Sequence, residues 1–153
     1  TADSTTWNAT SPTSTVFSVG NSAQSNNPAS ATYVAYCWAA VKGFSAFGSY
    51  TGNGSADGPF VYCGFRPRYV MIKCTNTTGD WWLEDTSRNT YNAADLVIFP
   101  NTSATESGSS VYYWDFLSNG FKLRSTSAGY NGSGNTYVYA AFAESPFKTS
   151  LAR

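Results

Sequence analysis

Short apolar runs of strand length recur along the chain between clusters of turn-forming residues. Polar stretches such as NSAQSNNPAS, TNTTGD and NTSATESGSS separate them, and apolar residues nowhere keep helical spacing for three turns. This pattern is typical of all-β proteins, and we predict an antiparallel β-sandwich of the jelly-roll or lectin-like kind with very little helix. The expected strands are residues 15–19, 32–39, 59–64, 69–74, 81–85, 96–99, 111–116, 120–124 and 136–143.

Two parts of the chain repeat one pattern. Residues 17–19 and 32–39 match residues 121–123 and 136–143 with a common offset of 104, which is 121 − 17 and also 136 − 32. We interpret the pair as two equivalent hairpins, each made of a short strand, a polar loop and a long strand. Both long strands have apolar side chains on both faces, which predicts that each is central in its sheet.

Length and charge limit the possible functions. The 153 residues suit one domain, and we expect a single sandwich over residues 15–153 after an N-terminal extension or linker over residues 1–14. The formal net charge is +0 and charged residues make up only 12%, so the chain lacks the electrostatic footprint of nucleic-acid binding. No apolar run is long enough to span a bilayer. We therefore expect no nucleic-acid partner and no membrane insertion.

The chain contains no histidine. This removes histidine-based acid–base catalysis, the Ser-His-Asp and Cys-His nucleophile systems, and most zinc and copper sites. An active site would have to use carboxylates, tyrosines or lysines. We predict that the protein is not an enzyme and that it holds no metal ion and no cofactor.

Each of the three cysteines, Cys37, Cys63 and Cys74, lies within an apolar run. This placement favours buried thiols that act as small apolar side chains. The alternative is one disulfide between two of them, which would leave the third thiol free.

A glycine-rich segment, GSYTGNGSADGP, covers residues 48–59. Its backbone amides could cradle an anion, and oxygens of Asn53, Ser55 and Asp57 could bind calcium. We favour a pair of tight turns, because glycine commonly serves turns that need a positive φ. Asn53 and Asp57 remain candidate ligand-binding residues.

Aromatic residues cluster at Trp81-Trp82 and over residues 111–116. Neighbours in a strand point to opposite faces, so one tryptophan of the pair should face inward and the other outward. An outward cluster could stack on a sugar or form a subunit interface, whereas an inward one would simply pack the core. The candidate binding residues of this kind are Trp82, Tyr112 and Trp114.

The adjacent carboxylates Glu84 and Asp85 should also lie on opposite faces of their strand. A glycosidase needs two carboxylates that face each other across a cleft, so this pair has the wrong arrangement. We expect Asp85 to pair with Arg88 or to cap the turn that follows the strand.

Several long blocks of the sequence resemble one family. They are GFSAFGSYTGNGSADGPFVYCGFRPRYVMIK (residues 43–73), TSRNTYN (86–92), DFLSNGFKLR (115–124), TYVYAAFAESPF (136–147) and the closing Ala152-Arg153. With these blocks the chain resembles the C-terminal domain of tail-fibre-type virion structural proteins of tailed phages, of the marine type that follows laminin-G-like modules. The resemblance brings no catalytic residues with it.

The resemblance implies a virion surface protein, which is a tail fibre, a spike or a decoration element that acts in assembly and host contact. It implies other virion proteins as partners, a homo-oligomer, and a host-surface glycan as a possible ligand. The alternative from another class is a carbohydrate-binding module or lectin that is not tied to a virion. A glycan-degrading depolymerase is the third hypothesis.

Overall fold

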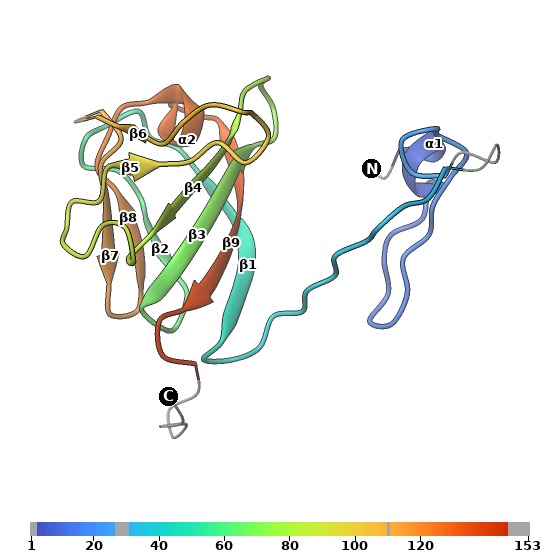
Figure 1. Cartoon of the computed structure of the whole chain (residues 1–153), viewed down its shortest axis with the longest axis horizontal. Helices are drawn as coiled ribbons and strands as arrows, with labels where there is room; N and C mark the ends of the chain where they lie inside the picture. The colour runs from blue at the N-terminus through green and yellow to red at the C-terminus, as the bar shows by residue number, and fades with distance from the viewer. Residues whose placement is uncertain (1–2, 27–30, 110, 147–153) are drawn as a thin grey trace. The chain divides into compact units, whose positions relative to one another are not determined.

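The computed structural model describes residues 3–26, 31–109 and 111–146 (Figure 1). The chain divides into two compact units, Thr1–Trp38 and Ala39–Arg153. The boundary between the units follows Trp38, whereas the sequence analysis expects a boundary after residue 14. Phe147 and the closing Ala152-Arg153 of the family resemblance lie outside the described residues.

The first unit begins with a single helical turn, α1 (Ser4–Trp7). The side chain of Asp3 caps it, because its carboxylate accepts hydrogen bonds from the backbone N–H groups of Thr5 and Thr6 at 3.3 and 2.6 Å. The Trp7 ring then packs edge-on against Phe17, with 6.5 Å between ring centroids. The N-terminal residues that were expected to form an extension or linker thus include a capped turn with an aromatic contact.

The strands predicted over residues 15–19 and 32–39 are absent, so those two predictions are wrong. Both segments have exposed side chains, among them Val16, Val34 and Tyr36. A strand forms only where a neighbouring strand satisfies its backbone groups, and none of the described residues supplies such a neighbour here. The first of the two equivalent hairpins therefore does not form.

The described part of the second unit contains nine strands in three antiparallel sheets. The four-stranded sheet has the order β1-β9-β3-β4, the three-stranded sheet β2-β8-β7, and β5 pairs with β6. The strands are β1 (Ser45–Thr51), β2 (Phe60–Tyr62), β3 (Pro67–Cys74), β4 (Trp81–Asp85), β5 (Leu96–Val97), β6 (Ser107–Gly108), β7 (Trp114–Leu117), β8 (Gly120–Leu123) and β9 (Thr136–Ala143).

The two larger sheets pack face to face and enclose the core. From the four-stranded sheet, Tyr50 and Tyr139 both place their rings edge-on to Phe121 of β8, at 6.3 and 5.6 Å between centroids. Alternate residues of β3 and β9, such as Ile72 and Ala141, are fully buried on the same inner face. The all-β antiparallel sandwich predicted from the sequence is confirmed, and β9 is central between β1 and β3 as expected.

The second predicted hairpin is also wrong, because its two strands belong to different sheets. β8 pairs with β2 and β7, whereas β9 pairs with β1 and β3. The intervening segment crosses from one sheet to the other and contains a second helical turn, α2 (Ala128–Asn131). The repeated sequence pattern therefore does not correspond to a repeated structure.

Candidate functional site

Trp81 and Trp82 place one ring on each face of β4, as predicted. Trp82 points into the sandwich, where its ring packs edge-on against Phe99 at 4.8 Å and Tyr130 at 5.1 Å between centroids. Gly129 makes this possible, because a Cβ there would lie only 2.3 Å from Cζ2 of Trp82. The outward ring is Trp81, whereas Trp82 is partly buried and packs against the core.

The other two aromatic candidates also belong to the interior. Trp114 is 0% exposed and packs against Phe121 and Tyr130, at 6.1 and 5.3 Å between centroids. Tyr112 is half-buried against Trp82 at 5.3 Å. Core packing, one of the three interpretations of this cluster, therefore describes these rings, because β7 turns Trp114 toward the opposite sheet and Tyr112, which precedes β7, packs on Trp82.

Asn53 and Asp57 lie in the glycine-rich loop between β1 and β2, where a network of hydrogen bonds holds the chain. The fully buried Asn131 organises it. Its Nδ2 donates to Asn53 Oδ1 at 3.2 Å and to the carbonyls of Ser55 and Ser125 at 2.8 and 2.7 Å, and its Oδ1 accepts the Asn53 N–H at 3.0 Å. This arrangement agrees with the tight-turn interpretation, because the side-chain amide of Asn53 takes part in the hydrogen bonds that hold the loop.

Asp57 forms an ion pair with Lys122 of β8, with 2.7 Å between Nζ and Oδ1. The ammonium group lowers the pKa of Asp57 through this hydrogen bond and through its charge. Since the Asp57 side chain is 83% exposed, the pair contributes little to stability. It leaves Asp57 as an anionic group at the tip of the loop.

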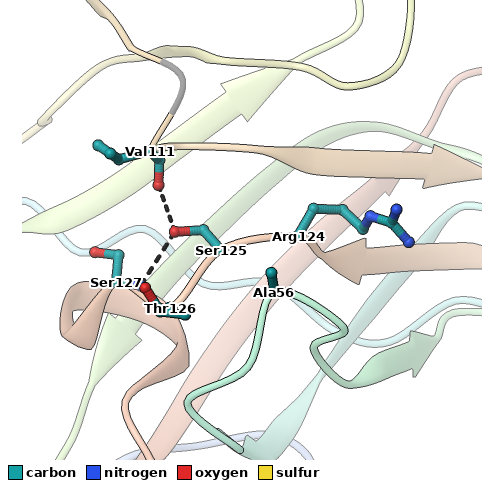
Figure 2. Close-up of a pocket in the computed structure, with 6 residues that line it drawn as sticks. All are labelled: Ala56, Val111, Arg124, Ser125, Thr126 and Ser127. Carbon is teal, nitrogen blue, oxygen red and sulfur yellow. Dashed lines mark hydrogen bonds between the residues drawn. The ribbon is translucent and has the colours of Figure 1, made fainter.

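A shallow pocket opens between this loop and the start of α2 (Figure 2). The hydroxyl of Ser125 donates to the carbonyl of Val111 and accepts the Ser127 N–H at 3.1 Å, so it is occupied by the protein's own backbone. Arg124 and Thr126 stand exposed at the rim. The pocket lining is Ala56, Val111, Arg124, Ser125, Thr126 and Ser127, which offers polar contacts but no paired acid and base.

Glu84 is the most unusual ionisable residue of the sandwich. It faces inward from β4 opposite Val70, is fully buried, and neither carboxyl oxygen has a hydrogen-bond partner among the described residues. Burial raises the pKa of Glu84 to about 9, although the charge of Arg88 opposes this. At neutral pH the group is therefore a protonated acid inside the core.

Asp85 points the other way, which confirms that the two carboxylates lie on opposite faces. It pairs with Arg88 as predicted, with 2.6 Å between Oδ2 and Nε, and accepts the backbone N–H of Ser87 at 2.9 Å. Arg88 also reaches Glu106 at 2.6 Å and the carbonyl of Leu96 at 2.7 Å. These contacts connect β4 to the β5–β6 pair.

The outward side chains of the four-stranded sheet make an apolar surface that the sequence analysis missed. Phe142 of β9 lies between Phe47 and Tyr69, at 5.8 and 5.7 Å between ring centroids. Trp81 and Val138, 37% and 38% exposed, lie beyond them. We call Phe47, Tyr69, Trp81, Val138 and Phe142 the outer apolar face. The sequence signal for this face was that apolar side chains occur at both odd and even positions of residues 69–74 and 136–143, which places them on both sides of the sheet.

All three cysteines are free thiols, so the disulfide alternative is not observed. Cys74 is buried as predicted, and burial raises the pKa of the half-buried Cys63 to about 12. The prediction of burial is wrong for Cys37, which is exposed. Within the described ranges, no group of three or more Cys, Asp and Glu residues is placed to hold a metal ion, and neither helix is long enough to cross a bilayer.

Comparison with known proteins finds one family. Residues 1–146 match the model of the family described as Domain of unknown function (DUF7483). No curated protein and no solved structure matches the chain.

Proposed function

The chain belongs to the DUF7483 family, and from that premise we propose that it is a surface structural protein of a tailed-phage virion. It would be a tail-fibre, spike or decoration element that acts in assembly and host contact, as a homo-oligomer and without catalysis. The sequence blocks quoted above support the virion assignment through their resemblance to tail-fibre-type proteins.

The observation that carries the contact role is the number of aromatic side chains on the outside of the protein. Tyr62 and Tyr91 are 67% and 84% exposed, and the outer apolar face adds further rings. Such rings are enriched where proteins bind one another, and leaving them in water is unfavourable. Three carboxylates support the non-catalytic part of the proposal, because Glu84 is buried without a hydrogen-bond partner among the described residues while Asp57 and Asp85 are paired with lysine and arginine.

The test is to locate the chain in particles. Immunogold labelling of purified virions, with an antibody raised against this chain, should label one position on the particle surface. Peptides of the chain should also be found when the same particles are digested and analysed by mass spectrometry. A chain that is abundant in the lysate of the infected host but absent from purified particles would overturn the proposal.

A glycan-binding role is the second candidate, and one observation favours it. The outward ring of Trp81 stands beside amide and carboxylate groups, since Asn101 accepts the backbone N–H of Trp81 at 2.8 Å and donates to Asp80 at 2.9 Å. An exposed ring beside such groups can stack on a sugar while the polar atoms bind its hydroxyls.

Glycan-array binding by the full chain tests this second role. Trp81→Ala should abolish the signal, and Trp81→Tyr, which keeps a ring, should retain most of it. Trp82→Ala is unsuitable, because it removes a ring that packs against the core and would destabilise the sandwich. Binding that survives Trp81→Ala would exclude this surface as the glycan site.

A further inference from the structure

The outer surface of the three-stranded sheet, which is one layer of the sandwich (Figure 1), carries two aromatic rings in a row. Burial alternates along β2, so Val61 points into the core while Phe60 and Tyr62 point outward. The two outward side chains are 44% and 67% exposed. Because successive outward positions of a strand are about 7 Å apart, the rings follow one another along the line of β2.

A glycine lies beside each of these rings. Cε2 and Cζ of Phe60 are both 3.0 Å from the point where a Cβ of Gly120 would be, so this ring packs against the bare backbone of β8. The phenol of Tyr62 has the same relation to Gly64, with 3.6 Å between Oη and the corresponding point. Each ring is therefore held against the backbone on one side and presents its remaining surface outward.

Charged side chains stand at one end of this row of rings. Lys122 lies directly opposite Phe60 in one ladder and opposite Asp115 in the next, so all three share the outer face. Lys122 pairs with Asp57 at 2.7 Å, and Arg124 pairs with Asp115 at 3.5 Å. The charge of Arg124 adds to the lowering of the Asp57 pKa by Lys122, which joins the two pairs. We call Asp57, Asp115, Lys122 and Arg124 the charged cluster.

The chemistry of this surface favours a neutral sugar over an ion or a protein. Aromatic rings contact the C–H groups of a sugar ring, while ammonium, guanidinium and carboxylate groups donate to and accept from its hydroxyls. The charged cluster holds two positive and two negative groups, so it gives no net attraction to an ionic ligand. Protein interfaces are depleted of charged residues at their centre, whereas here charges stand directly beside the rings.

We propose that the outer surface of β2 and β8 is a binding site for a neutral oligosaccharide. One sugar ring stacks on Phe60 and another on Tyr62, and the charged cluster binds hydroxyl groups of the sugar nearest Phe60. Asp57, a candidate from the sequence, belongs to this site. The inference rests on the glycan-binding role proposed above and assigns that role to the three-stranded sheet instead of the Trp81 surface.

A glycan array and a titration test this assignment. The full chain and its Trp81→Ala variant are applied to an array of neutral, carboxylated and sulfated oligosaccharides, and both should bind the same neutral members. The neutral member that binds most strongly is then titrated by calorimetry. Phe60→Ala and Tyr62→Ala should each weaken its binding about tenfold, and Tyr62→Phe, which keeps the ring, should stay within about threefold of the native Kd.

Tyr91→Ala is the matched control, because it removes an exposed ring that lies outside this surface. Its Kd should equal that of the native chain. Phe60→Ala and Tyr62→Ala remove exposed side chains, so their thermal unfolding should remain cooperative and their near-UV spectra should keep the signal of the packed core.

The charged cluster has a test of its own. Asp57→Asn combined with Asp115→Asn leaves two positive charges beside the rings, which should raise the binding of sulfated array members relative to neutral ones. An unchanged order of preference would contradict the role given to the cluster.

Three results would overturn the site. If no neutral member binds, the glycan-binding role itself fails. If binding is lost in Trp81→Ala but kept in Phe60→Ala and Tyr62→Ala, the role stands and the site lies at Trp81. If the native chain associates with itself, and the Phe60 and Tyr62 variants break that association without any sugar being bound, the rings form a protein interface.

Discussion

The carboxyl group of Glu84 carries a proton into the core when the protein folds. Its pKa is about 9 in the folded state and near the ordinary 4.5 in the unfolded chain. Between these two pH values the folded state holds a proton that the unfolded state releases. The free energy of unfolding therefore falls as pH rises through this window.

We predict that Glu84→Gln stabilises the protein increasingly as pH rises from about 5 to 8, because glutamine keeps the shape and never ionises. Urea unfolding at several pH values measures this, and the two curves should converge at acidic pH. Glu144→Gln is the matched control, since it breaks only a part-exposed pair with Arg66 and should cost less than about 1 kcal/mol. Parallel pH profiles for the native chain and Glu84→Gln would contradict the account.

At the scale of the element, α2 depends on a residue that helix propensity alone would reject. Gly129 lies in the middle of this single turn, where alanine is the better helix former. The indole of Trp82 occupies the space that a side chain at Gly129 would need, so packing overrides propensity.

Gly129→Ala should therefore destabilise the protein by about 1–3 kcal/mol, because the Trp82 indole must shift in a packed interior. Thermal unfolding measures the loss, and near-UV circular dichroism should register the displaced ring. Gly79→Ala is the control, since a Cβ there meets nothing within 4 Å and should change stability by less than about 0.5 kcal/mol. Equal effects of the two substitutions would contradict the packing argument.

Strands rich in aromatic and β-branched residues were predictable, whether they lie in the centre of a sheet, as β9 does, or at its edge, as β4 does. The ranges predicted for β4 and β9, residues 81–85 and 136–143, match the structure. β1 was missed, because SAFGSYT is poor in β-branched residues and becomes a strand through its pairing with β9. Residues 32–39 were predicted as a strand for the opposite reason, since their β propensity is high but no described strand pairs with them.

The candidate site was less predictable than the fold. Alternation showed that Trp81 and Trp82 face opposite ways, but which one faces inward depends on the register with β3, where Trp82 lies opposite Ile72. The ion pair of Asp85 with Arg88 was predictable because it is local. The role of Asn131 was not, because it binds a loop 78 residues away in sequence.

At the scale of the whole molecule, the described residues of the sandwich core all belong to the second unit. Every member of the described apolar core, from Val61 to Ala143, lies within Ala39–Arg153. The hydrophobic stabilisation of the sandwich therefore does not require the first 38 residues.

We predict that Ala39–Arg153, produced without the first unit, folds by itself. Its near-UV spectrum should keep the signal of the packed rings, and its Tm should lie within about 4 °C of that of the full chain, which corresponds to about 1 kcal/mol. A shortened chain that lacks cooperative thermal unfolding would show that the first unit is needed for the core.

The five tryptophans of the protein differ in their exposure to solvent. Trp114 is fully buried and Trp82 is partly buried in the sandwich, whereas Trp81 on its outer face is 37% exposed and Trp7 and Trp38 of the first unit are 45% and 61% exposed. Buried indoles emit at shorter wavelengths and resist iodide, so quenching should remove the long-wavelength part of the emission first.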